Sequence, residues 1–263
     1  MPDSYTTLSA LFSGGLVGFT LGLIGGGGSI LATPLLLYVV GLSNPHMAIG
    51  TGALAVSVNA YTNFLGHARK GNVVWPCALV FAALGTVGAL LGSSLGKAVD
   101  GQMLLFLFGL IMIAVGVFML RPVTAVPTGP LVVTRPICIR TAALALIAGL
   151  ASGFFGIGGG FLIVPALMLA TRMPMIKAVG TSLLAVGTFG LSTALNYSFS
   201  GLVDWPIAGL FIVGGLGGGL IGTRLSLKLG QSKRLLNTLF AMIIFIVAAY
   251  ILFKSGMALR STS

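Results

Sequence analysis

The sequence has no glutamate, and Asp3, Asp100 and Asp204 are its only acidic residues. Charged residues of both signs make up 6% of the chain, whereas soluble domains carry about 25%. So few charges cannot cover the surface of a soluble globule, which leaves lipid as the solvent for most of this surface. The scarcity of charge therefore excludes an ordinary soluble protein and predicts an integral membrane protein.

The shortage of carboxylates also argues against several kinds of transport. Carriers of cations and protons usually bury acidic side chains in the membrane, but all three aspartates fall near the ends of apolar segments or in loops. We therefore expect no metal and no cofactor. His67 is the one candidate proton carrier close to a predicted segment, although a histidine beside Arg69 and Lys70 also suits a plain interfacial position.

Cysteine and the signatures of membrane enzymes are equally scarce. Cys77 and Cys138 form no CxxC pair, so we expect no structural disulfide. The sequence contains no HExxH motif, no visible pairing of a nucleophile with histidine and no set of acidic metal ligands. These absences predict that the chain is not an enzyme.

Apolar residues, glycine and dispersed positive charge dominate instead. Hydrophobic residues make up 57% of the 263 residues, and 40 residues are glycine. One helical span needs about 20 apolar residues, so the length allows about eight full spans, or about ten segments if some are broken. The net charge of +11 comes from lysines and arginines that stand between apolar runs, which is typical of cytoplasmic loops rather than of nucleic-acid binding. We predict an all-α, polytopic transmembrane helix bundle.

The two halves of the chain are similar to each other. GFTLGLIGGGGSILATP ends at Pro34 and GLASGFFGIGGGFLIVP ends at Pro165, and after one deletion an offset of 130 residues persists. The matching positions are Gly50-Thr51 with Gly180-Thr181, Gly71 with Gly201, Trp75-Pro76 with Trp205-Pro206, and Gly85, Gly88 and Gly92 with Gly215, Gly218 and Gly222. We therefore predict an N-terminal repeat over 1–120, a proline-rich linker over 121–140 and a C-terminal repeat over 141–263.

Each half shows the same succession of segments. An apolar run stops at a glycine cluster, a short apolar piece with proline follows, and three long apolar segments complete the half. The expected segments are 11–24, 30–41, 48–68, 73–96 and 102–120 in the first half, and 142–157, 161–171, 178–199, 205–226 and 235–253 in the second. The linker holds four prolines and three arginines, which predicts an extended loop outside the membrane.

The distribution of basic residues indicates how the halves are oriented. If each half crosses the membrane an even number of times, seven of the fourteen lysines and arginines fall on each side, which violates the positive-inside rule. If the broken segment and its short partner return the chain to the starting side, eleven fall on the linker side and three on the other. This distribution favours two inverted repeats, with the linker in the cytoplasm and both termini outside.

The glycine clusters at 25–29 and 156–160 are the main candidate for a binding site. Backbone that leaves a helix inside a membrane must be buried in protein or line a wet cavity. A helix that restarts there offers free N–H groups and the positive end of its dipole to an anion, and transporters with inverted repeats place their sites at such breaks. Close helix packing through small residues explains the same glycines, and both interpretations stay open.

Polar side chains recur on one face of segments 48–68 and 178–199. They follow three- and four-residue steps, so each set lies along one side of a helix. These amides and hydroxyls suit an oxyanion, but they can equally bridge helices or satisfy freed backbone groups. The predicted substrate-binding residues are Gly27, Gly28, Ser29, Thr51, Asn59, Asn63, Gly158, Gly159, Gly160, Thr181, Ser182, Thr188 and Asn196.

The motifs LIGGGGSILATP and FGIGGGFLIVP, each followed by an AxGT segment (AIGTG and AVGTS), resemble the TauE/SafE sulfite exporter family over about residues 8–254. The resemblance implies a bacterial inner-membrane permease for sulfur-containing anions such as sulfite, thiosulfate, sulfoacetate or other organosulfonates. The positions that match the shared motif are Gly27, Gly28, Gly158, Gly159, Thr51 and Thr181. The first copy departs from the second at Gly26 and Ser29, where the second has Ile157 and Gly160, so a strictly symmetric site is not implied.

The sequence thus predicts a permease that moves a small sulfur oxyanion or sulfonate across the bacterial cytoplasmic membrane by alternating access. The expected site lies where the glycine clusters meet helices 48–68 and 178–199. An anion channel or a membrane subunit without transport activity is the alternative. The expected partners are the anionic substrate and the lipid bilayer, and not nucleic acid. A homo-oligomer, the coupling ion and the direction of transport stay open.

Overall fold

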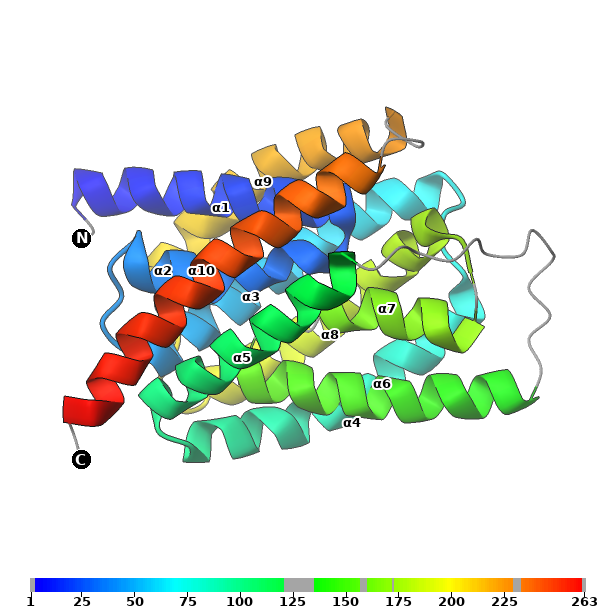
Figure 1. Ribbon diagram of the computed structural model, residues 1–263. Coiled ribbons are helices and arrows are strands. Elements are labelled where there is room, and N and C mark those ends of the chain that lie inside the picture. The colour runs from blue at the N-terminus through cyan, green and yellow to red at the C-terminus, as the bar shows by residue number, and fades with distance from the viewer. Residues whose placement is uncertain (1–2, 121–134, 157–159, 172, 229–232, 262–263) are drawn as a thin grey trace.

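The computed structural model describes residues 3–120, 135–156, 160–171, 173–228 and 233–261, and within them the chain is helical apart from turns and short connections. Every expected segment corresponds to one of the helices of Figure 1. Their bounds are α1 (Ser4–Ile24), η1 (Gly26–Leu31, a 3₁₀ helix), α2 (Ala32–Tyr38), α3 (Pro45–Arg69), α4 (Trp75–Ala98), α5 (Gly101–Leu120), α6 (Arg135–Phe155), α7 (Gly160–Thr171), α8 (Met175–Ser198), α9 (Trp205–Lys228) and α10 (Lys233–Ser261).

Side-chain caps define where several helices begin. Asn44 caps α3, Asp100 caps α5 and Asp204 caps α9, each through a side-chain oxygen that accepts backbone N–H groups of the first turn. A cap supplies partners for N–H groups that the helix itself leaves unpaired. Two of the three aspartates therefore serve helix ends, which agrees with their expected places outside the apolar segments.

The start of α6 differs from the sequence-based expectation. Residues 135–140 were expected in an extended loop, but α6 already begins at Arg135. Proline is tolerated in the first turn of a helix, where its missing N–H would have no partner in any case. Pro136 stands in that turn, so this proline does not mark a loop. Residues 121–134 of the predicted linker lie outside the described residues.

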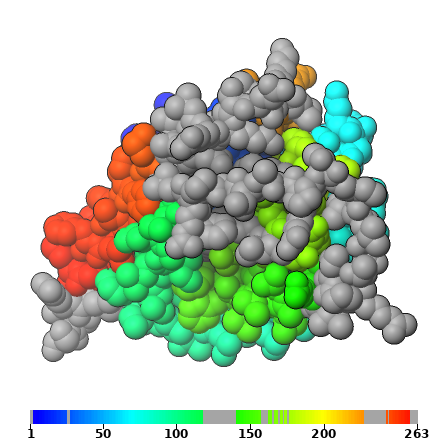
Figure 2. Space-filling model, turned by 45° about the vertical axis from the view of Figure 1, so that its right-hand side comes forward, coloured from blue at the N-terminus to red at the C-terminus, as the bar shows by residue number. Residues whose placement is uncertain are grey.

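Four helices of the described chain are long and apolar enough to cross a membrane by length and composition: Ser4–Ile24, Trp75–Ala98, Ile176–Ser198 and Trp205–Ser226. Shorter apolar helices are Gly28–Tyr38, Gly101–Val117, Arg140–Phe155 and Ile244–Met257. Large apolar side chains such as Leu91, Ile246 and Phe253 are more than half exposed. Figure 2 shows one face on which α10, α5 and α6 lie side by side. The expected number of about eight full spans stays a prediction.

The tightest helix contacts join parallel helices from different halves. A Cβ added at Gly14 or Gly18 of α1 would collide with the backbone of Phe211 or Gly215 of α9. The two helices run in the same direction, because both partners advance by four residues. Glycine allows this approach because it has no side chain. The equivalent contacts between α6 and α4 are Gly149 with Gly85 and Gly153 with Ala89.

In contrast, the helices that occupy equivalent places in the two halves lie antiparallel. Near the start of α3, Gly50 packs against Tyr197, and near its end His67 packs against Gly180. α3 therefore runs opposite to α8. The corresponding contacts between α5 and α10 are Gly109 with Leu252 and Gly116 with Phe245, which makes this pair antiparallel as well.

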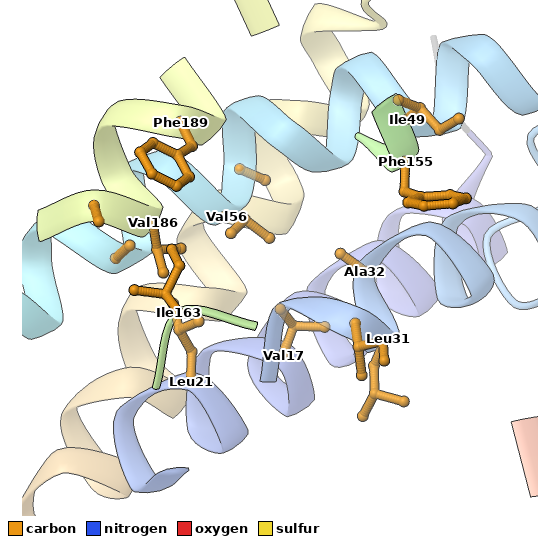
Figure 3. Close-up of a cluster of buried hydrophobic side chains, with 14 of the residues drawn as sticks. Val17, Leu21, Leu31, Ala32, Ile49, Val56, Phe155, Ile163, Val186 and Phe189 are labelled. Carbon is orange, nitrogen blue, oxygen red and sulfur yellow. The ribbon is translucent and has the colours of Figure 1, made fainter. Parts of the chain in front are cut away.

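The bundle has two distinct ends and an apolar interior. α1 begins and α10 ends at one end, here called the termini end, and α5 ends and α6 begins at the opposite end, here called the linker end (Figure 1). Between them, helices from both halves meet in the core. The buried side chains that Figure 3 draws there include Val17, Leu21, Val56, Ile163 and Val186.

Gly217→Val and Gly218→Val form a matched pair that tests the contact of α1 with α9. A Cβ at Gly218 would collide with the carbonyl oxygen of Gly15, whereas a Cβ at Gly217 meets nothing within 4 Å. Because overpacking costs about 1–3 kcal/mol, Gly218→Val should lower the midpoint of thermal unfolding in detergent. Gly217→Val should leave it near the wild-type value, and equal midpoints for the two variants would contradict the close contact.

Candidate functional site

Both glycine clusters interrupt a helix, as their sequence predicts. Gly25 has a φ of 78° and Gly156 a φ of 65°, a conformation that residues with side chains rarely adopt. Gly25 lies against Val179, near the start of α8, and Gly156 lies against Ile49, near the start of α3. Since α3 and α8 are antiparallel, the two interruptions lie toward opposite ends of this helix pair.

The segments that follow the interruptions pack against each other in the interior. η1 contacts α7 and α1. Gly28 leaves no room for a side chain, because a Cβ there would meet the backbone of Thr20 and Leu21. Ser29 is fully buried. Gly27 belongs to η1 and Gly160 begins α7, while Gly158 and Gly159 lie outside the described residues. The described part of this region is thus enclosed by protein.

Two amide side chains of α3 are buried without a full set of hydrogen-bond partners. Asn59 is 1% exposed, and neither its Nδ2 nor its Oδ1 has a partner. Asn63, one turn later, is 3% exposed; its Oδ1 accepts a hydrogen bond from the Thr223 hydroxyl at 3.1 Å, but its Nδ2 has none. Leaving a buried polar group unpaired costs about 1–3 kcal/mol. These amides are therefore the clearest sign of a role other than packing.

Helix α9 provides the surface against which the two amides lie. A Cβ added at Gly215 would overlap the amide of Asn59, and one at Gly219 would come within 2.6 Å of Asn63 Oδ1. Thr223 follows at the same four-residue spacing, and we call Asn59, Asn63 and Thr223 the amide site. Thr223 was not among the predicted residues, although its spacing from the two glycines places it on the same face of the helix.

Thr51 and Thr181 make equivalent hydrogen bonds between the halves. Thr51 Oγ1 accepts from the backbone N–H of Asp204 at 2.9 Å, and Thr181 Oγ1 accepts from that of Val74 at 3.0 Å. Each threonine thereby holds the turn that precedes a long helix of the other half. They lie at opposite ends of the α3–α8 pair, so they do not share one site. Both hydroxyls have a structural partner, and a part in substrate binding stays a prediction.

Three other predicted side chains form hydrogen bonds elsewhere than with the amide site. Ser182 Oγ donates to the Val179 carbonyl oxygen and Thr188 Oγ1 to that of Ala185, so both bond within their own helix. Asn196 lies near the end of α8, where its Oδ1 accepts from Lys97 Nζ at 2.7 Å. The sequence does not predict this contact of Lys97, because the distribution of charges between the two sides does not show which helix end a lysine contacts.

The titratable and metal-binding groups do not gather at the amide site. His67 is fully buried on α3 next to Gly180. From the sequence, this histidine was either a candidate proton carrier or an interfacial residue. Within the part of the chain that the structure describes, no three histidine, cysteine or acidic side chains lie close enough to hold a metal ion. Amide and hydroxyl groups, together with the imidazole of His67, are therefore the polar groups that the described interior offers.

Comparison with known proteins connects this architecture to a family. A family model described as "Sulfite exporter TauE/SafE" matches residues 10–251. A "Probable membrane transporter protein" of Xylella fastidiosa (strain 9a5c) is 60% identical over 248 residues, which cover 94% of this chain and 95% of the relative. The "Probable membrane transporter protein YunE" of Bacillus subtilis (strain 168) is 27% identical and covers 88% of this chain and 93% of the relative. No solved structure matches the chain.

Thr51→Val and Thr51→Ser test the bonds between the halves. Valine has the shape of threonine but no acceptor for the N–H of Asp204, whereas serine keeps the hydroxyl. Losing one such hydrogen bond costs about 1 kcal/mol. We expect Thr51→Val to lower the midpoint of thermal unfolding more than Thr51→Ser does, and Thr181→Val to behave like Thr51→Val. A valine variant as stable as the wild type would show that the bond is absent in the membrane protein.

Proposed function

The chain belongs to the sulfite exporter TauE/SafE family of membrane transporters, and on that premise we propose that it moves a small sulfur-containing anion across the bacterial cytoplasmic membrane. Sulfite, sulfoacetate and other organosulfonates are the candidate substrates. The observation that carries this proposal is the pair of α3 amides, Asn59 and Asn63, which are buried with unpaired donors against α9.

An oxyanion suits these amides because its oxygen atoms accept hydrogen bonds from the unpaired Nδ2 groups. Neutral donors attract the anion without burying a permanent positive charge, so the ligand can enter and also leave. The unpaired Oδ1 of Asn59 needs a donor. The hydroxyl of a protonated oxyanion such as hydrogensulfite can supply it, as can a water molecule that accompanies the anion.

We also propose that the two halves are inverted repeats in the membrane. The antiparallel contacts of α3 with α8 and of α5 with α10 support this, because repeats of the same orientation would place equivalent helices in the same direction. The paired bonds of Thr51 and Thr181 support a twofold relation between the halves. In transporters of this architecture the axis lies in the membrane plane, and the substrate site lies near it.

The linker end of the bundle is assigned to the cytoplasm. With inverted halves, eleven of the fourteen lysines and arginines stand on that side, as the positive-inside rule requires. Both the end of α5 and the start of α6 are found there (Figure 1). The termini end, with Lys97 and the ends of α8 and α10, then faces the outside.

Alternating access requires one part of the bundle to move against another. The pairs α1–α9 and α4–α6 each join helices of both halves through contacts that leave no space for a Cβ, so each pair moves as one body. α3 and α8 cross between these pairs, and there Ser57 Oγ donates to the Gly187 carbonyl oxygen at 2.7 Å. We place the moving surface along this crossing, and the moving parts are mixed pairs rather than the two sequence halves.

Transport in proteoliposomes tests the function and its alternatives. Purified protein is reconstituted, and uptake of radiolabelled sulfite, sulfoacetate and sulfate is followed with and without an imposed ion gradient or membrane potential. Accumulation of sulfite or sulfoacetate against its electrochemical gradient is the expected result. Flux that only follows the gradient would indicate an anion channel. No flux of any of these anions would indicate a subunit without transport activity and would contradict the proposal.

Asn59→Leu separates a role in transport from a role in folding. Leucine has nearly the same shape as asparagine but lacks the unpaired polar atoms, so the variant should unfold at the wild-type temperature or above it. Sulfite transport should fall by at least about tenfold, because a lost hydrogen bond to a charged ligand is worth about 1.5–3 kcal/mol.

Thr62→Val is the matched control on the same helix, because its hydroxyl bonds only to the Val58 carbonyl oxygen of its own turn. It should retain both stability and transport. A fully active Asn59→Leu variant would show that the substrate does not bind at the amide site.

A further inference from the structure

A polar cluster around Lys97, at the termini end of the bundle, is not accounted for by the amide site. Lys97 Nζ donates to the carbonyl oxygen of Asn196 at 3.0 Å, to its Oδ1 at 2.7 Å and to Ser200 Oγ at 2.9 Å. Asn196 Nδ2 in turn donates to Ser93 Oγ at 2.6 Å and to Ser94 Oγ at 3.0 Å. The ammonium group therefore lies where the end of α4 meets the end of α8.

The acceptors of Lys97 are all neutral, so its protons are bonded but its charge is not balanced. Asp100, the nearest carboxylate in sequence, instead accepts the backbone N–H groups of Gln102 and Met103 and caps α5. Lys97 is half-buried, and a charge taken partly out of water is stabilised by an opposite charge close by. A mobile anion from solution can supply that charge.

A second basic side chain lies on the same aromatic ring. The ammonium of Lys97 is 5.9 Å from the ring centroid of Tyr197, within the range of a cation–π contact. The ring of His46 is 6.2 Å from the same centroid, and its Nε2 lies 3.2 Å from the Val99 carbonyl oxygen. Two basic groups thus meet at the fully buried Tyr197.

The cluster is present at one end of the bundle, and the equivalent sequence positions of the other end carry different residues. With the offset of 130 residues that relates the halves, Lys97 corresponds to Leu227, Asn196 to Gly66 and His46 to Ile176. A set of side chains needed only to join two helix ends would be required at both ends, because the same helix contacts recur there. The difference between the ends indicates a role that belongs to one side of the membrane.

We propose that the Lys97 cluster is a docking site for a small oxyanion at the outer mouth of the transporter, from which the anion passes to the amide site. Ser94 and Ser200 are exposed. An arriving oxyanion replaces Ser200 Oγ as an acceptor of Lys97, and the two serine hydroxyls turn to donate to it. This inference rests on the proposed anion transport. A charged mouth of this kind raises the association rate of its ligand by about 10–1,000-fold at low salt.

The test compares wild type and Lys97→Gln in membrane vesicles of both orientations, with radiolabelled sulfite as the probe. Glutamine can still bond to Asn196 but carries no charge. In right-side-out vesicles the KM for sulfite should rise about tenfold, and the increase of KM with ionic strength seen in the wild type should become weaker. In inside-out vesicles the KM should change by less than about twofold, because the cluster lies on the far side from the entering anion.

Lys254→Gln is the matched control. Lys254 is an exposed lysine at the same end of the bundle, where its ammonium lies 6.0 Å from the ring centroid of Tyr250 and outside the cluster. Lys254→Gln removes one positive charge, as Lys97→Gln does, but from outside the cluster. Its KM values should therefore equal those of the wild type in both orientations. Lys97→Arg keeps the charge and should restore most of the affinity that Lys97→Gln loses.

The outcomes separate this inference from the proposed function. If wild-type vesicles take up no sulfite, the proposed function fails and the docking site fails with it. If the wild type transports but Lys97→Gln keeps its KM and salt dependence, the docking site alone is overturned. Equal loss of transport in both orientations, or a Lys97→Arg variant as defective as Lys97→Gln, also overturns it, because the lysine then acts as a structural bond and not as a charge.

Discussion

The structure depends on the direct contact of helix backbones at glycine. Lipid gives apolar helices little reason to associate, so close packing has to hold the bundle together. Along α1 with α9, and again along α4 with α6, a methyl group at the contact positions would strike the backbone of the neighbouring helix. Each contact joins a helix of the first half to a helix of the second, so the halves are bound into one unit. The buried amides of Asn59 and Asn63, on α3, lie against α9 of the first of these pairs.

Much of the fold could be predicted because membrane helices follow length and apolarity. The repeated glycine motifs located both interruptions, and each expected segment matches a helix. The sequence misjudged residues 135–140, because a proline in the first turn of α6 resembles a proline in a loop.

The site was harder to predict. Asn59 and Asn63 could be selected because an amide in lipid is costly without a partner. A hydroxyl that bonds to a carbonyl oxygen of its own helix turn, such as that of Ser182, cannot be told in sequence from a hydroxyl that bonds to another helix or to a ligand.

The two halves differ in chemistry although they share their packing. Where Gly215 of α9 lies against Asn59, the equivalent Gly85 of α4 lies against Phe189. Where Tyr197 meets Lys97 and His46, the equivalent His67 has Leu227 and Ile176 at the corresponding sequence positions. A repeated scaffold thus presents different side chains to its two ends and to its two inner helix contacts.

The hydrogen bonds of Thr51 and Thr181 bear on the origin of the chain. Each hydroxyl reaches a turn that belongs to the other half, and the tight glycine contacts of α1 with α9 and of α4 with α6 likewise lie between the halves. A single half would leave these groups without partners. An antiparallel second copy of the same half would supply the partners of the threonine hydroxyls and of the glycine contacts. With the inverted orientation proposed above, an ancestral protein of half this length would have been a dimer of identical chains inserted in opposite directions, before duplication and fusion allowed the copies to diverge.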